Sequence, residues 1–237
     1  MNIFLTGGSG GIGREIVRAL AAPKENTVYF TFCQNVQQAE QLVKKFRNVK
    51  ALRCDLSKSE DIERVKKKLA GVEFDVIINN AFPKFELQEF TRTSWAKVQE
   101  AIDVGVKAHF EFIKEFSKPM VKKRQGSIIT ILSSVVLNKP PAQTVPYVIA
   151  KYAMLGFHQA LVSDFVKWGL RVNAISPVMV RTDFLSNLPD HYVNMVEESM
   201  PSKKLLEAAD VAGMVKFCLS RDAAQMNGVN IPLTGGG

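Results

Sequence analysis

Tyr147 and Lys151 stand four residues apart, a spacing that places two side chains on the same face of a helix. A free tyrosine has a pKa of about 10, and a neighbouring ammonium lowers that pKa by favouring the phenolate. A general acid works best when its pKa approaches the operating pH. The hydroxyl of Ser134, thirteen residues upstream, could hydrogen-bond the same oxygen. The three residues predict proton transfer at an oxygen, although a Tyr and a Lys at this spacing are common on helices.

A glycine-rich loop follows the first apolar segment of the chain. A short strand is expected over 1–6 and a helix over 14–22, with Gly7, Gly11 and Gly13 in a G-x-x-x-G-x-G spacing between them. Glycines let the backbone turn tightly and approach a ligand closely, and a helix N-terminus offers unpaired N–H groups to a phosphate. This context favours a dinucleotide-binding loop over a glycine-rich turn that has no ligand.

The residues after the second and third strands bear on the choice of cofactor. A strand over 27–32 leads into the segment 33–35, which contains no acidic residue. In dinucleotide-binding folds a carboxylate at this place binds the ribose 2′-OH, and it would repel a 2′-phosphate. Its absence favours NADP(H), and NAD(H) stays open because no arginine replaces the acid. Asp55, after a third strand over 49–54, could face an adenine edge or cap a turn.

Apolar strands alternate with helical segments along the rest of the chain. Further strands are expected over 74–79, 127–132, 170–175 and 229–233. Further helices are expected over 36–46, 95–123, 146–168 and 208–220, and one more helix should end at about residue 69. This alternation indicates right-handed parallel βαβ units. We therefore predict one α/β domain over residues 1–237, a doubly wound Rossmann-like sheet of about seven parallel strands with helices on both faces. The segment 178–204 is expected to be irregular and to form a lid over the site.

Composition limits the classes of function. The 237 residues are 46% hydrophobic and 23% charged, which is ordinary for a globular protein. The three cysteines match no metal or redox spacing and suit a reducing compartment, so we expect a cytoplasmic protein without a metal site. We find no signal peptide and no apolar run near the roughly 18 residues that a membrane-spanning helix needs, so no membrane partner is expected.

The chain is basic, with a formal net charge of +8. Its basic clusters, among them residues 122–124 and 203–204, could meet nucleic acid, a membrane surface or an acidic protein. Each cluster also falls on a polar face or an end of an expected helix, where it could simply be solvated. No aromatic interleaving and no nucleic-acid motif accompanies the clusters, so a nucleic-acid partner is not expected.

Together, these motifs resemble the short-chain dehydrogenase/reductase family over nearly the whole chain. No single motif is decisive, but their order and spacing are specific. The likeness is greatest to the 3-oxoacyl-acyl-carrier-protein reductase branch, through Lys122–Thr130 and Ser134–Val136. The residues that carry the family resemblance are Thr6, Gly7, Gly11, Ile12, Gly13, Asp55, Leu56, Asn79, Asn80, Ala81, Ser134, Tyr147, Lys151, Asn173 to Pro177, Thr182 and the C-terminal glycines.

The resemblance implies a role for each matching residue. Tyr147 would be the catalytic acid or base, Lys151 would lower its pKa and bind the nicotinamide ribose, and Ser134 would hold the substrate carbonyl or hydroxyl. Ser134 keeps the usual family distance to the tyrosine, and the adjacent Ser133 is the alternative. The family also implies a homotetramer or a homodimer. The implied cofactor-binding residues are Gly7, Ser9, Gly11, Ile12, Gly13, Cys33, Asn35, Asp55, Leu56, Asn80, Ala81, Tyr147, Lys151, Pro177, Val180 and Thr182.

Three positions depart from the family pattern. Phe82 stands where the family usually has a glycine after Asn-Asn-Ala, and Val178 stands where it usually has a glycine after proline. Gly105 takes the place of an asparagine whose main-chain carbonyl is associated with a water beside the lysine. Glycine keeps a carbonyl but loosens a helix by roughly 1 kcal/mol relative to Ala. We expect asparagine to be accepted at position 105, and Phe82 could narrow the nicotinamide pocket or pack away from it.

The expected function is that of an NADP(H)-dependent ketoreductase, which moves a hydride between a nicotinamide and a carbonyl or hydroxyl carbon. One candidate substrate is a 3-oxoacyl thioester on an acidic acyl carrier protein, because the basic residues at 122–124 and 203–204 could steer an acidic partner. If these residues only keep the protein soluble, a small neutral ketone is the natural substrate. One alternative is a small-molecule alcohol dehydrogenase of the same family. The other is a dinucleotide-binding protein with little turnover, and only Gly105 and Phe82 support this second alternative.

Overall fold

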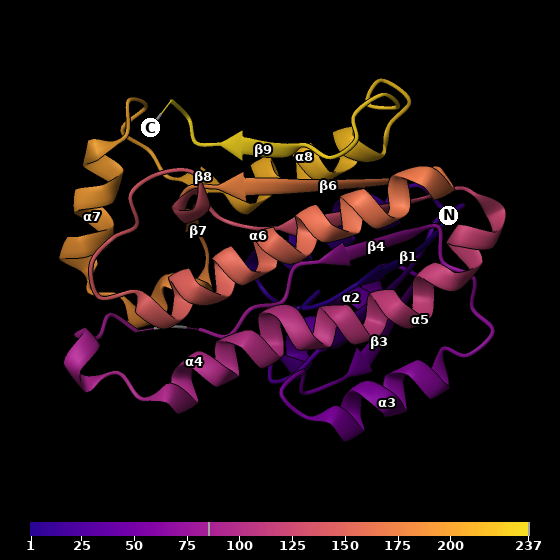
Figure 1. Cartoon of the computed structure of the whole chain (residues 1–237), viewed down its shortest axis with the longest axis horizontal. Helices are drawn as coiled ribbons and strands as arrows, with labels where there is room; N and C mark the ends of the chain where they lie inside the picture. The colour runs from indigo at the N-terminus through magenta and orange to yellow at the C-terminus, as the bar shows by residue number, and fades with distance from the viewer. Residues whose placement is uncertain (85, 237) are drawn as a thin grey trace.

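A seven-stranded parallel sheet forms the centre of the computed structural model, which describes residues 1–84 and 86–236 (Figure 1). The strand order is β3-β2-β1-β4-β5-β6-β9, so the chain builds the sheet outward from β1 in one direction and from β4 in the other. This confirms the predicted doubly wound arrangement. Gly237, the last residue of the predicted domain, lies outside the described residues. The strands are β1 (Asn2–Leu5), β2 (Thr27–Phe32), β3 (Val49–Arg53), β4 (Val76–Asn79), β5 (Gly126–Ile131), β6 (Leu170–Pro177) and β9 (Asn230–Leu233).

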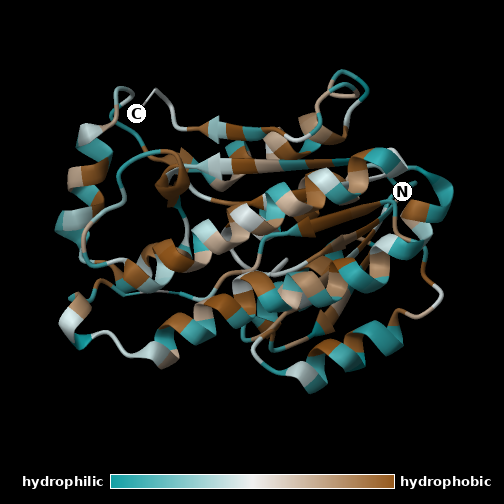
Figure 2. Cartoon of the chain, in the orientation of Figure 1, coloured by the Kyte–Doolittle hydropathy of each residue, from teal (hydrophilic) through white to brown (hydrophobic). Residues whose placement is uncertain are grey.

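Helices cover both faces of the sheet. They are α1 (Gly11–Ala21), α2 (Val36–Lys45), α3 (Ser59–Lys68), α4 (Trp95–Ile102), α5 (Ala108–Lys123), α6 (Val145–Phe165), α7 (Asp190–Ser199) and α8 (Ala208–Leu219). Ile3 and Leu5 of β1 are buried with α1, α2 and α8, whereas Phe4 is buried with α3, α5 and α6 on the other face. Successive side chains of a strand point to opposite faces, which explains the alternation. Figure 2 shows hydrophobic residues concentrated on the central strands, whereas hydrophobic and hydrophilic residues alternate along the helices.

The long helix expected over 95–123 is continuous but not uniform. Between α4 and α5, Asp103–Lys107 form a π-helical turn, and Gly105 is buried within it. A π-helical turn inserts one extra residue into the helix and is frequent at functional sites. The turn therefore marks the position of the family asparagine as a point where the backbone departs from the α-helix.

The segment 178–204 is more regular than predicted. It contains the short strand β7 (Val180–Arg181), a 3₁₀ helix over Asp183–Asn187 and the helix α7, and β7 pairs in parallel with β8 (Leu206–Glu207). The expectation of an irregular segment is wrong because its prolines mark boundaries of elements: Pro189 is the N-cap of α7, and Pro201 follows its end. In Figure 1, α7 lies beyond the ends to which the arrows of β6 and β9 point.

Within the described residues, no helix is long and apolar enough to cross a membrane. The same residues include no group of three or more His, Cys, Asp or Glu side chains that could hold a metal ion. The cysteines are free thiols: Cys33 is exposed, and Cys54 and Cys218 are buried.

The aromatic cluster around Phe4 predicts a large cost of truncation. Phe4 is fully buried, and its ring centroid lies 4.8 Å from those of Phe112 and Phe116. Phe4→Ala should lower the free energy of unfolding by about 3–5 kcal/mol, measured by urea denaturation. Phe90→Ala is the control, because Phe90 is 74% exposed and its loss should change stability by less than about 0.5 kcal/mol. Equal losses in the two variants would contradict this description of the core.

Candidate active site

Four strand ends bring the predicted site residues to one edge of the sheet. Thr6 follows β1, Asn80 follows β4, Ser133 comes shortly after β5, and Pro177 is the last residue of β6. These strands are neighbours or near neighbours and run parallel, so their carboxyl ends meet at the same edge. The first turns of α6, which carry Tyr147 and Lys151, follow the end of β5 through the segment 132–144.

Tyr147 and Lys151 lie together on α6, as predicted. The helix begins at Val145 with Pro146 in its first turn, where a missing N–H costs no helical hydrogen bond. Lys151 is buried, its Nζ donates to the carbonyl of Ile131 at 3.0 Å, and the same Nζ lies 5.7 Å from the ring centroid of Tyr147. This places the ammonium beside the phenol ring.

Burial dominates the protonation of both groups. It lowers the pKa of Lys151 to about 7, because a charged amine loses its hydration there. It raises the pKa of Tyr147 to about 12. Burial sets the direction of the Tyr147 shift, and the lowering by the Lys151 ammonium that the sequence predicted is not among its causes. The phenol stays protonated at neutral pH, which is the form that a general acid needs.

The hydrogen bond that lowers the Tyr147 pKa comes from the hydroxyl of Ser133. Ser133 is buried and extended, with φ −167°, so it continues the direction of β5. Ser134 begins the 3₁₀ helix Ser134–Val136 and is only half-buried. The two serines therefore differ in backbone and in burial, and only the hydroxyl of Ser133 acts on the pKa of Tyr147. The contact with Tyr147 therefore favours Ser133 as the substrate-holding serine, whereas the family spacing favoured Ser134.

A buried network joins the glycine loop to the π-helical turn. The hydroxyl of Thr6 accepts hydrogen bonds from the main-chain N–H groups of Asn80 and Ala81, both at 3.0 Å. Thr6 Oγ1 also lies 3.0 Å from Nε2 of His109, and Nδ1 of His109 lies 2.7 Å from the carbonyl of Gly105. Burial lowers the pKa of His109 to about 4, so the ring is neutral and donates to Gly105 through Nδ1. His109 was missed because the only signal in the sequence is its position four residues after Gly105.

The glycine loop is closely packed, as its spacing suggested. Gly7 has φ +71°, and an added Cβ would lie 3.0 Å from Ala81. An added Cβ at Gly13 would lie 2.1 Å from the carbonyl of Gly7. The side chain of Asn80 fixes the loop by donating to the carbonyls of Thr6 and Gly7 at 3.0 and 3.2 Å. A close backbone turn before the N-terminus of α1 fits a phosphate-bearing cofactor.

Cys33 and Asp55, which were expected near the adenosine, follow the ends of β2 and β3. These two strands lie on the far side of β1 from β4. Cys33 is exposed, and Asp55 accepts hydrogen bonds from the N–H and the hydroxyl of Ser57 at 3.1 and 2.7 Å. Asp55 therefore caps a turn, one of its two predicted roles. Burial and the charge of Asp55 raise the pKa of Cys33. Arg53, the last residue of β3, acts in the opposite direction because its positive charge lowers that pKa. Arg53 was not predicted, because the sequence gives no sign that the end of β3 lies beside Cys33.

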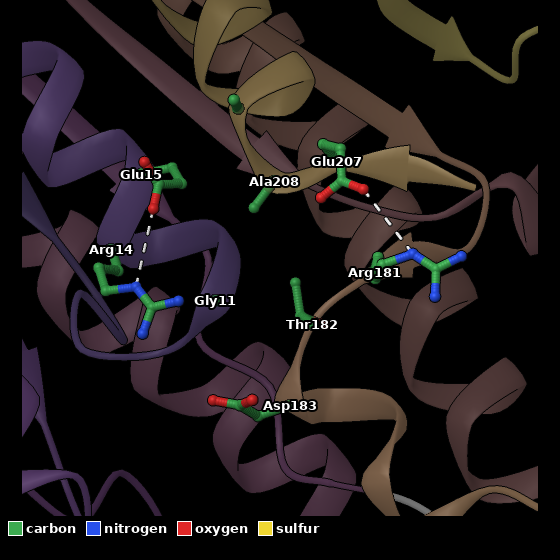
Figure 3. A pocket seen from close by; sticks show the side chains of 9 residues that line it. Gly11, Arg14, Glu15, Arg181, Thr182, Asp183, Glu207 and Ala208 are labelled. Carbon is green, nitrogen blue, oxygen red and sulfur yellow. Dashed lines mark ion pairs between the residues drawn. The ribbon is translucent and has the colours of Figure 1, made fainter. Parts of the chain in front are cut away.

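The segment after β6 meets the glycine loop at Thr182 (Figure 3). The methyl group of Thr182 lies against Gly11, where an added Cβ would stand 2.4 Å from Cγ2. A cavity of about 430 Å³ opens beside this contact, between α1, β7 and the start of α8. Arg14 lines it, and Arg181 pairs with Glu207 at 3.7 Å. Two predicted cofactor residues from distant parts of the sequence thus lie in contact.

Phe82 packs toward the Tyr147–Lys151 pair. Its ring meets the Tyr147 ring edge-on with centroids 5.2 Å apart, and Lys151 Nζ lies 4.5 Å from the Phe82 centroid. An added Cβ at Gly105 would lie 2.9 Å from Cε2 of Phe82 and 3.2 Å from Sδ of Met154. An asparagine at position 105 would therefore need the Phe82 ring to shift, and the expectation that asparagine is accepted there stays a prediction.

Comparisons with known proteins identify the family of the chain. The profile of the family described as enoyl-(acyl carrier protein) reductase matches residues 7–237. The 3-oxoacyl-acyl-carrier-protein reductase FabG of Escherichia coli (strain K12) is 29% identical over 239 residues, which cover 98% of this chain and 95% of the relative. The human dehydrogenase/reductase SDR family member 4 is 30% identical over 243 residues, which cover 98% and 86%.

A solved structure shows the same fold. A short chain dehydrogenase family protein from Francisella tularensis subsp. tularensis SCHU S4 superposes with a TM-score of 0.86 at 28% identity, covering 99% of this chain and 97% of that one. The chain therefore belongs to the short-chain dehydrogenase/reductase family of oxidoreductases, in the branch that resembles the 3-oxoacyl-acyl-carrier-protein reductases.

Proposed function

We propose that this chain is an NADP(H)-dependent ketoreductase. The observation that supports the proposal is that Tyr147, Lys151 and Ser133 lie together at the carboxyl edge of the sheet. The glycine loop, which follows β1, lies at the same edge. We further propose a homotetramer or a homodimer in the cytoplasm, on the family resemblance and the unpaired cysteines.

The side chains divide the work of reduction. A bound nicotinamide supplies the hydride. Tyr147 holds its proton because burial raises its pKa, and it donates that proton to the carbonyl oxygen of the substrate. Ser133 lies beside the phenol, and on substrate binding its single O–H turns from the phenol oxygen to the substrate oxygen and fixes that oxygen's position. Lys151, held by the carbonyl of Ile131, places a positive charge beside the phenol and so favours loss of its proton as the reaction proceeds.

Tyr147→Phe tests the proposed acid. The variant should lose about 10²–10⁴-fold in kcat for ketone reduction, because the phenol OH is the proton donor, while the Kd of NADPH changes little. Tyr152→Phe is the matched control, since Tyr152 lies on the same helix and is 47% exposed. Near-wild-type rates in Tyr147→Phe would show that the acid has been misassigned.

Ser133→Ala and Ser134→Ala distinguish the two serines. We expect Ser133→Ala to lower kcat by about 10²-fold, the usual effect of removing a donor to a developing oxyanion, and Ser134→Ala to lower it much less. Steady-state rates on one ketone, with NADPH saturating, give the comparison. The opposite ranking would return the role to Ser134 and show that the family spacing outweighs the contact seen in the structure.

Preference for NADP(H) rests on charge around Cys33. The exposed segment 33–35 carries no carboxylate, and Arg53 brings a guanidinium near it. We expect Arg53→Ala to weaken NADPH binding about tenfold and to leave NADH binding unchanged, because only NADPH has a 2′-phosphate. Lys50→Ala on the same strand is the control, since Lys50 lies over the ring of Tyr29.

Cys33→Asp should shift the preference toward NADH by placing a carboxylate near the 2′-position. Isothermal titration with each cofactor measures the Kd values. Tighter binding of NADH than of NADPH to the wild-type chain would refute the NADP(H) preference.

We also propose a 3-oxoacyl thioester carried by an acidic acyl carrier protein as substrate. The name of the Escherichia coli relative and the net charge of +8 support this choice. The structure separates the two basic clusters that could steer the carrier. Lys122 and Lys123 end α5 and Arg124 follows them, at the amino edge of the sheet, whereas residues 203–204 follow α7 beyond the carboxyl edge (Figure 1).

The carrier proposal predicts a salt effect that depends on the substrate. Between low and physiological salt, kcat/KM should fall roughly tenfold for a carrier-bound ketone and change little for a free ketone. Reversing the charges of Lys122 and Lys123 should lower only the carrier-bound rate. The same reversal at Lys203 and Lys204 is the matched variant at the opposite edge, and it shows from which edge the carrier approaches. Equal salt responses for the two substrates would discard the carrier and leave the ketoreductase proposal standing.

A further inference from the structure

The buried ammonium of Lys151 has few partners for its charge. An ammonium carries three N–H donors, and the described residues give Nζ one hydrogen bond, to the carbonyl of Ile131 at 3.0 Å. The titratable groups that face it are Tyr147 on its own helix and His109 on α5. Burial keeps the phenol protonated and the imidazole neutral, so neither supplies a negative charge.

The face of Phe82 supplies part of what the ammonium lacks. Lys151 Nζ lies 4.5 Å from the centroid of the Phe82 ring, nearer than its 5.7 Å to the Tyr147 ring. The π-electrons of a ring attract a cation within about 6 Å of its centroid, and the attraction strengthens where water is excluded. Phe82 also meets Tyr147 edge-on, so a single ring contacts both members of the pair.

The Phe82 ring lies directly against residue 105, where glycine leaves room for it. An added Cβ there would lie 2.9 Å from Cε2 and 3.2 Å from Cδ2 of the Phe82 ring, and 3.2 Å from Sδ of Met154. A contact under 3.0 Å forces a shift, and the nearest atom belongs to the Phe82 ring. The carbonyl of Gly105 is held by His109, which fixes the π-helical turn beneath the ring.

We propose that Phe82 and Gly105 form a matched pair in which the Phe82 ring, admitted by the missing side chain at 105, holds Lys151 as an ammonium beside Tyr147. Phe82 is thus a positioning residue of the reductase proposed above, on which this inference rests. The two departures from the family pattern are then one compensated change, and they support turnover.

The pKa of Lys151, measured by the pH dependence of its ¹³Cε resonance in isotope-labelled protein, tests the pair without requiring turnover. Lys151→Met assigns the resonance. Phe82→Leu should lower this pKa by at least about half a unit, a threefold change in the ratio of amine to ammonium, because the ring no longer stabilises the charge. Phe82→Tyr keeps the ring and should keep the pKa.

Gly105→Ala should act through the ring. It should lower the pKa of Lys151 when Phe82 is present and have little effect in the Phe82→Leu background, where the shorter side chain leaves room. Thermal unfolding monitors folding of each variant, and Gly105→Ala supplies the same test if Phe82→Leu does not fold. An unchanged pKa in both single variants, or equal effects of Gly105→Ala in the two backgrounds, would overturn the proposal.

The same variants carry a kinetic readout. With a ketone and NADPH, the alkaline limb of the kcat profile should move to lower pH in Phe82→Leu and should be restored in Phe82→Tyr. If Phe82→Leu shifts the pKa of Lys151 but the protein reduces no ketone, the proposed Phe82–Gly105 pair stands and the proposed ketoreductase function is contradicted. An unshifted pKa and an unmoved limb in an active chain would count against the pair alone.

Discussion

Burial of the Lys151 ammonium is the constraint on which the site depends. Removing a cation from water costs several kcal/mol even in a relaxed protein interior, so the surrounding chain must offset that cost. The carbonyl of Ile131 is placed to accept because β5 ends at this residue, and its last pairing with β6 is opposite Ile175. The ring of Phe82 covers the ammonium from another side. The ends of two strands and the start of α6 are thereby fixed relative to one another.

The same edge of the sheet connects the two halves of the site. Thr6 follows β1 and holds the backbone after β4, while His109 links Thr6 to the carbonyl of Gly105. The loop that would hold the phosphates and the helical turn beneath Phe82 therefore share one buried hydrogen-bond network. A change in this network would therefore disturb the glycine loop and the helical turn together, although the two belong to separate elements.

The sequence predicted the sheet and the Tyr147–Lys151 pair, because both depend on local patterns. Apolar strands alternating with helices specify a parallel sheet, and a spacing of four places two side chains on one helix face. The contacts that decide the details join residues distant in sequence. No spacing shows that Phe82 fills the space beside Gly105, or that Thr182 lies against Gly11. A spacing of thirteen or fourteen residues across a loop likewise cannot choose between two adjacent serines.

The central claim is that the chain moves a hydride between a nicotinamide cofactor and a carbonyl carbon. The most direct test is to incubate the purified protein with NADPH deuterated at the transferable position and a panel of ketones, and to locate the deuterium by NMR. The account predicts deuterium on the carbinol carbon of at least one product, with matching oxidation of the cofactor. Binding of the cofactor without oxidation by any ketone, including a 3-oxoacyl thioester, would contradict it.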